Sequence, residues 1–201
     1  LTFNGQEFKS ANGLLDLLNE SIEEEPLYEP IHLKSGDIEV AFTHGSGYGE
    51  NIYSFVNGQN TTLGGTHLAA FKEAIAKVLK DFFKKDFNPV DVRQSIIGAV
   101  SVRIQEPEFE GQTKVQLGSK YMWQNKLEGT HGPTIIKEMT DFLMADLDNY
   151  LHRIMEDIHE NCVKYGKQVM DHMREVLHTS SLQMQLEVGK FDRYKTYKAL
   201  S

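Results

Sequence analysis

A long helical pattern lies between segments that are typical of strands, and this order constrains the fold more than any other feature. From residue 67 to residue 83 apolar side chains recur every three or four positions, as on one face of a packed helix. Apolar and polar residues alternate before it, at 38–42 and 51–56, and a run rich in Val and Ile follows at 96–104. Strands on both sides of a packed helix predict an α/β (α+β) domain.

The remaining elements follow from the same patterns. Because only a Gly-rich turn separates the strands at 38–43 and 51–56, a hairpin is their simplest arrangement. Thr66 precedes the long helix and is expected to be its N-cap. Helical spacing resumes at Thr134 and continues to about residue 178, where Gly166 either splits one helix into two or merely weakens it. Shorter elements are predicted at 1–3 (strand), 14–18 (helix), 31–33 (strand), 90–95 (helix) and 182–188 (strand-like).

Composition limits the function classes. The 201 residues suffice for one large domain, or for one domain with an appendage. No apolar run approaches the roughly 20 residues that span a bilayer, so no membrane partner is expected. The single Cys162 excludes an internal disulfide, and the scattered His residues predict no metal site. The chain begins at Leu1 rather than Met, which suggests a piece of a longer protein.

Charge gives a mixed indication about nucleic acid. The net charge of −8 counts against tight, autonomous DNA binding. A local cluster of lysines nevertheless predicts one basic face, which is either an ordinary solvated helix surface or a DNA contact. These lysines are Lys72, Lys77, Lys80, Lys84 and Lys85.

A candidate functional loop follows the apolar run at 96–104. Pro107, Gly111 and Gly118 interrupt regular structure, so Lys114 is expected to be presented on a loop beside Gln112 and Thr113. An ammonium group on a flexible stem is suited to meeting a terminal phosphate as a point charge. The spacing alone does not distinguish such a phosphate contact from a solvated connection.

A Gly-rich block, NGQNTTLGGTH at residues 57–67, opens the long helix. Gly64 and Gly65 permit tight backbone conformations and a close approach to neighbouring elements. A helix N-terminus of this kind could also bind an anion. His67 at the helix start is more typical of a capping or packing residue than of a catalytic base.

Both motifs resemble those of a known family. Residues 106–118 resemble the PEFEGQTKxxLG signature of the B subunits of gyrase and topoisomerase IV, which are the ATPase subunits of bacterial type IIA topoisomerases. Residues 57–67 resemble the NxxxTxxGGTH block of the same proteins. Weaker similarity at 3–18, 91–93 and 148–151 extends the resemblance over most of residues 1–160, although Gln94 stands where Glu is common.

The resemblance implies a transducer domain of the ribosomal protein S5 domain 2-like type at 31–125. Residues 1–30 would lead from an ATP-binding domain, and 126–201 would form a mainly helical extension. Gln112 and Lys114 would bind the γ-phosphate of ATP, with Lys114 as the catalytic residue through charge stabilisation. Supporting roles fall to Thr113, Gly64, Gly65, Thr66 and His67.

The resemblance also implies partners that these residues do not contain. ATP with Mg would be bound mainly by an N-terminal GHKL domain absent from this chain, so the fragment alone would be inactive. A C-terminal Toprim domain, an A-type subunit and double-stranded DNA complete the expected assembly, in the bacterial cytoplasm and associated with the nucleoid. The departure of residues 57–61 (NGQNT) from the NNINT of gyrase slightly favours topoisomerase IV. The alternatives are a non-enzymatic S5-like binding module and the middle domain of another GHKL ATPase.

Overall fold

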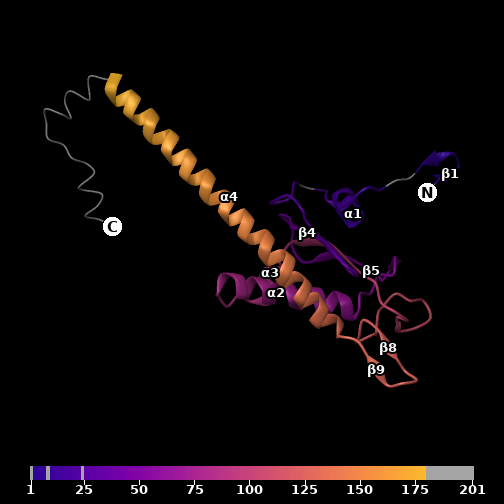
Figure 1. Ribbon diagram of the computed structural model, residues 1–201. Helices are drawn as coiled ribbons and strands as arrows, with labels where there is room; N and C mark the ends of the chain where they lie inside the picture. Colours follow the sequence, from indigo (N-terminus) through magenta and orange to yellow (C-terminus); the bar gives the residue numbers. More distant parts are fainter. Residues whose placement is uncertain (1, 8–9, 24, 180–201) are drawn as a thin grey trace. The chain divides into compact units, whose positions relative to one another are not determined.

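The computed structural model (Figure 1) describes residues 2–7, 10–23 and 25–179. The chain divides into two compact units, Leu1–Tyr150 and Leu151–Ser201. The strand-like segment expected at 182–188 lies outside the described residues. The candidate loop and the Gly-rich block both belong to the first unit.

A five-stranded sheet forms the centre of the first unit. Its order is β3-β4-β7-β5-β6, and every neighbouring pair is antiparallel except β5 and β7, which are parallel. The strands are β3 (Ile31–Ser35), β4 (Ile38–His44), β5 (Asn51–Val56), β6 (Gln59–Asn60) and β7 (Ile96–Val102). Two small hairpins pair β1 (Thr2–Phe3) with β2 (Gln6–Glu7), and β8 (Gln124–Asn125) with β9 (Thr130–His131).

The predicted hairpin between 38–43 and 51–56 is wrong, because β7 lies between these two strands. Val100 of β7 stands opposite Val40 on one side and Ser54 on the other. The physical reason is the burial of β7, because its backbone amides and carbonyls are out of reach of water at both edges and need a neighbouring strand on each side. The parallel pairing of β5 with β7 needs a crossover, which the intervening helices α2 (Thr66–Phe83) and α3 (Pro89–Arg93) supply.

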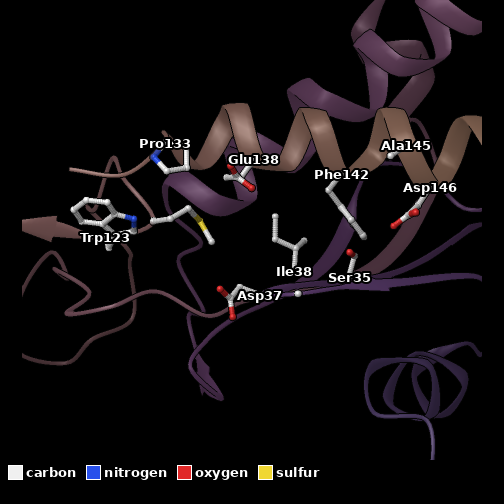
Figure 2. Close-up of a pocket in the computed structure, with 11 residues that line it drawn as sticks. Ser35, Asp37, Ile38, Trp123, Pro133, Glu138, Phe142, Ala145 and Asp146 are labelled. Atoms are coloured by element: carbon white, nitrogen blue, oxygen red, sulfur yellow. The ribbon is translucent and has the colours of Figure 1, made fainter.

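The helix α2 covers one face of the sheet, as its apolar period predicted. The rings of Phe71 and Phe42 of β4 meet edge to face, with their centroids 5.9 Å apart. The first turns of α4 (Ile135–Thr179) lie over the same face, where Phe142 and Ile38 approach one another (Figure 2). Apolar side chains buried from the two helices are Ala70, Phe71, Ala74, Ile75, Val78, Ile135, Met139, Phe142, Leu143 and Leu147.

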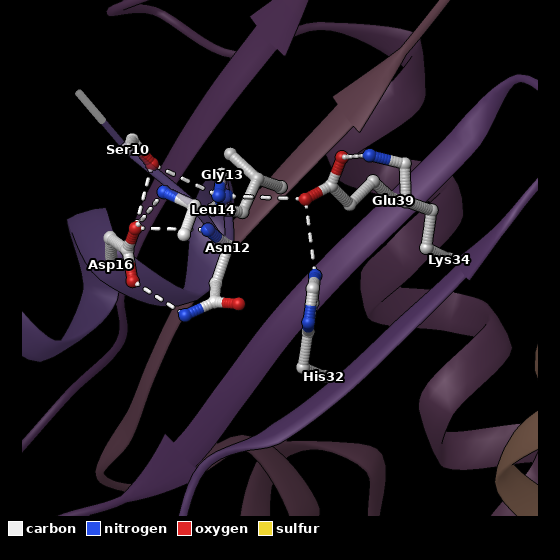
Figure 3. A network of polar contacts seen from close by, with 9 residues as sticks. Ser10, Asn12, Gly13, Leu14, Asp16, His32, Lys34 and Glu39 are labelled. Carbon is white, nitrogen blue, oxygen red and sulfur yellow. Dashed lines mark hydrogen bonds and ion pairs between the residues drawn. The ribbon is translucent and has the colours of Figure 1, made fainter.

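The opposite face of the sheet holds α1 (Leu14–Ser21), in which Leu18 is fully buried and the first residue is held by Glu39 of β4 (Figure 3). Its Oε1 accepts a hydrogen bond from the Leu14 amide at 3.2 Å and lies 3.1 Å from Nε2 of His32, while Oε2 pairs with Lys34 at 3.0 Å. Partial burial alone would raise the pKa of Glu39, but these three contacts outweigh it and lower the pKa. Glu39 therefore fixes the start of α1 on the sheet as an ionised group.

A second carboxylate organises the turn before α1. Asp16 accepts hydrogen bonds from the hydroxyl of Ser10 at 2.7 Å and from the amides of Ala11 and Asn12 at 2.9 and 3.0 Å (Figure 3). The amide of Asn12 and the hydroxyl of Ser10 lower the pKa of Asp16 to about 2. Residues 10–16 are thus closed into a turn that delivers the chain to α1.

The helix α4 is continuous from Ile135 to Thr179, so Gly166 does not split it. Its part in the second unit, described by itself, exposes apolar side chains such as Ile158 and Val163. None of the described helices combines the length and apolar character that crossing a membrane requires.

Candidate functional site

The two sequence motifs lie side by side, joined by backbone hydrogen bonds. The Leu63 amide donates to the carbonyl of Val115 at 2.9 Å, and the Leu117 amide donates to that of Gly64 at 3.0 Å. The Thr66 amide returns a bond to the Leu117 carbonyl at 3.1 Å. The Gly-rich block that starts α2 is therefore paired with the returning arm of the candidate loop.

Gly65 is the reason that this pairing is so close. A Cβ built on Gly65 would lie 2.4 Å from the carbonyl oxygen of Leu117 and 2.5 Å from its amide nitrogen, distances that no side chain tolerates. Its φ of +132° is also a conformation that L-residues rarely adopt. Only glycine allows the two backbones to approach at this position.

The outgoing arm of the loop pairs with the returning arm, on the side opposite the Gly-rich block. Glu110 donates its amide hydrogen to the carbonyl of Gln116 at 2.8 Å, and Gly118 donates to that of Glu108 at 2.8 Å. Leu117, between Phe109 and Gly65, is only 1% exposed. We call residues 63–66, 108–110 and 115–119 the loop base, and residues 111–114 the loop tip.

Thr66 is not the N-cap that the sequence predicted. Gly65 occupies the cap position without a side-chain hydrogen bond, and Thr66 is the first residue of α2. The Thr66 hydroxyl donates instead to the carbonyl of Ser119, 2.6 Å away. The prediction failed because the partner of this hydroxyl is 53 residues distant in the sequence, whereas capping was judged from neighbours alone.

The loop tip is exposed and carries the predicted phosphate-binding side chains. Gln112, Thr113 and Lys114 all face solvent, and Lys114 has a positive φ of 55°. In the part of the chain that the structure describes, no hydrogen bond or ion pair engages these three side chains. Nearby, Glu108 is paired with Lys126, which compensates an acidic charge close to the tip. The tip can therefore offer a cation and neutral donors to an external group.

His67 is fully buried beneath the start of α2, so it has no direct route to a substrate. Thr61 donates its hydroxyl hydrogen to the carbonyl of Ser54 at 2.9 Å, and Ser54 donates to that of Thr61 at 2.8 Å. Nε2 of His67 lies 3.1 Å from Oγ1 of Thr61, which is itself 2.7 Å from the hydroxyl of Ser54, so the ring joins a buried polar cluster. Burial lowers the pKa of His67 to about 4, so the ring is neutral at pH 7. This burial favours the interpretation of His67 as a packing residue.

The cluster of lysines on and after α2 is partly neutralised within the protein. Glu50 pairs with both Lys72, at 2.6 Å, and Arg93, at 2.8 Å. Lys80 pairs with Asp86 at 2.6 Å. These contacts favour the interpretation of the cluster as an ordinary solvated helix surface.

A cavity of about 430 Å³ lies between the β3–β4 turn and the first turns of α4 (Figure 2), and its lining includes no residue of the loop tip. Its charged lining groups are Asp37, Glu138 and Asp146, with Trp123 at one end. Carboxylates repel phosphate, so this cavity does not suit a nucleotide phosphate. Within the described residues no group of three or more His, Cys, Asp or Glu side chains is arranged to hold a metal ion.

Ser119 and Leu117 are parts of the loop base that the sequence motifs did not single out as functional. Ser119 contacts both Glu108 and Thr66, and Leu117 bridges Gly65 and Phe109. Their sequence signal is weak because both roles depend on backbone atoms of segments that are distant or not otherwise marked in the sequence. The only local sequence indication of these roles is that Leu117 is followed by Gly118.

Comparison with known proteins identifies relatives by sequence. The model of a family described as DNA gyrase B matches residues 11–175. The B subunit of DNA topoisomerase 4 from Borreliella burgdorferi is 43% identical over 120 residues, covering 59% of this chain and 20% of that protein. The B subunit of DNA gyrase from Clostridium acetobutylicum is 39% identical over 121 residues, covering 55% of this chain and 19% of that protein. The chain thus spans about a fifth of the length of these curated relatives.

A solved structure shares the fold. The ATP-binding domain of topoisomerase IV from Francisella tularensis, in complex with a small-molecule inhibitor, superposes with a TM-score of 0.50 at 20% identity. The match covers 71% of this chain and 39% of the solved one. The likeness supports the mixed α/β architecture and carries no further argument about chemistry.

Proposed function

The chain belongs to the DNA gyrase B family, and we propose that it contains the transducer domain of an ATP-dependent type II topoisomerase B subunit. Residues 31–125 form this domain, residues 1–30 lead from an ATP-binding domain, and residues 126–201 are its helical extension. In this proposal the chain is a piece of a longer subunit that works with an A-type subunit on double-stranded DNA.

The exposed loop tip is the observation that carries the proposal. A cation that is to reach a phosphate in another domain must be free of internal partners, and Lys114 meets this condition among the described residues. The ion pair of Glu108 with Lys126 removes a nearby competitor for the ammonium group. An exposed Gln112 two residues away can donate a neutral hydrogen bond to the same phosphate.

In the proposed mechanism the residues of this chain act electrostatically. Mg-ATP, bound in the neighbouring domain, supplies the phosphoryl group and the charge that develops on it during hydrolysis. Lys114 stabilises this charge without moving a proton, and Gln112 orients the γ-phosphate. When the γ-phosphate leaves, the tip loses its partner and is released. The loop thus acts as a switch that is ordered only while the γ-phosphate is present.

The test is Lys114→Ala in the full-length subunit assembled with its A-type partner. Loss of one preorganised charge should lower ATP turnover by about 100-fold. Nucleotide binding should be largely spared, because most contacts to the nucleotide belong to the ATP-binding domain. Lys120→Ala is the control, since it removes an exposed lysine from the same stretch and should leave turnover unchanged. Unchanged turnover in Lys114→Ala would exclude the phosphate role.

Within the family we favour topoisomerase IV over gyrase, because residues 57–61 depart from the NNINT block of gyrase. The relatives reported above include both enzymes. Decatenation compared with supercoiling by the full enzyme distinguishes them, since negative supercoiling against torsional stress would identify gyrase.

A further inference from the structure

Ser119 is the point where three segments of the loop base meet. Its hydroxyl accepts a hydrogen bond from the amide of Glu108 at 2.7 Å, and its own amide donates to the Glu108 carbonyl at 3.2 Å. Its carbonyl accepts the hydroxyl of Thr66 at 2.6 Å. Ser119 is buried, with 9% of its surface exposed, so water competes poorly for these bonds. A displacement of either arm of the loop therefore reaches Ser119.

Thr66 connects this point to α2 through a side chain. The backbone bonds between the Gly-rich block and Leu117 hold the two segments in register, but they end at the Thr66 amide. The Thr66 hydroxyl extends the connection two residues further along the returning arm, to Ser119. Because Thr66 is the first residue of α2, a force on its side chain acts directly on the end of that helix.

We infer that the Thr66–Ser119 hydrogen bond is a coupling contact, by which the position of the loop tip sets the position of the start of α2. Thr66 is a positioning residue in this inference and does not touch the nucleotide. The inference rests on the proposed function, because the loop must move with the state of the γ-phosphate. Loss of the bond should leave hydrolysis intact while the loop transmits its movement less effectively to the rest of the domain.

The experiment measures two activities of the full-length subunit assembled with its A-type partner: ATP turnover, and strand passage of plasmid DNA per ATP hydrolysed. Thr66→Val keeps the shape of the side chain and removes the donor. We expect turnover to remain near that of the wild type and strand passage per ATP to fall about fivefold, the factor that corresponds to one net hydrogen bond. Thr66→Ser retains the hydroxyl and should restore the ratio.

Thr62→Val is the matched control, because Thr62 lies in the same block but is exposed and makes no side-chain hydrogen bond among the described residues. Its ratio of strand passage to hydrolysis should equal that of the wild type. If Thr66→Val does not fold, Thr66→Ala removes the same donor with less crowding. An unchanged ratio in the folded Thr66 variant, or an equal fall in turnover and strand passage, would overturn the inference. Lys114→Ala tests the proposed function separately, so the two failures are distinguishable.

Discussion

The loop tip and the loop base differ in almost every physical property, although they are adjacent in sequence. The tip is exposed, and its side chains have no partner within the described residues. The base is a ladder of backbone bonds around Leu117, closed by a glycine that no other residue can replace without moving its neighbours. One motif therefore contains a part that is open to an external group and a part that shapes the backbone.

The difference predicts which substitutions affect stability and which affect activity. Changes in the base should lower the free energy of unfolding, whereas changes at the tip should leave it nearly unchanged unless they strain the backbone. On the 201-residue chain, substitutions at Gly65 and Gln112 test this division, and substitutions at His67 and Glu39 extend the comparison to the surrounding domain.

Gly65→Ala should have the largest effect. The new Cβ would overlap the backbone of Leu117 and the residue would keep a positive φ, so we expect a loss of at least about 3 kcal/mol in the free energy of unfolding. Gly111→Ala at the tip is the matched control, with a φ of +86° and open space around the Cβ position. It should cost only about 1–2 kcal/mol. Equal losses in urea denaturation would contradict the crowding argument.

Acidification should destabilise the domain through His67, which is buried next to the loop base at the start of α2. Its folded pKa of about 4 is below the ordinary value of 6.5, so the unfolded chain binds the proton more readily. The free energy of unfolding is therefore unaffected by this residue above pH 6.5, where the ring is neutral in both states. It falls progressively as the pH drops from 6.5 to about 4, by up to about 3 kcal/mol. Comparison with His67→Gln isolates this contribution, since the variant does not titrate. Parallel pH profiles for the two proteins would contradict the prediction.

Glu39→Gln tests the contact that holds α1 on the sheet, far from the loop. The amide retains the shape of the carboxylate but loses its charge, so the contacts with Lys34 and His32 weaken. We expect a loss of about 1 kcal/mol at pH 7. The difference between the two proteins should disappear as the pH falls through the lowered pKa of Glu39, because the wild-type carboxylate then becomes neutral. A difference that persists at low pH would indicate a packing effect instead.

Gln112→Ala should have the smallest effect on stability, within about 0.5 kcal/mol of the wild type. Its side chain is exposed and the described residues offer it no partner. A larger loss in thermal or urea denaturation would show that the tip is held by the rest of the domain, and the division between tip and base would fail.

The elements of the fold could be predicted from the sequence where the signal is local. The apolar period of α2 and the alternation in β4 and β5 indicated these elements within one residue or two of their bounds. The separation of β4 from β5 could not be predicted in this way, because it depends on where β7 is inserted. The presence of a long helix between two strands was the available signal, since this order is typical of a parallel crossover.

The candidate site divides in the same manner. The expected exposure of Lys114 follows from the Pro and Gly residues around it, which are local features. The roles of Gly65 and Thr66 depend on Leu117 and Ser119, which are some 50 residues away in the sequence. The sequence indicates a tight backbone conformation at Gly65, but not which segment approaches it.

The central position of β7 has a consequence for how the chain acquires its structure. The hairpin of β3 and β4 leaves the ribosome with the outer edge of β4 unpaired, and the strand that pairs with that edge begins only at Ile96. Until then Val40 and Phe42 lie on an open edge that can pair with another chain. Such non-local pairing slows folding, because a long loop must close first. Recovery of soluble protein should therefore depend on the rate of translation across residues 45–102.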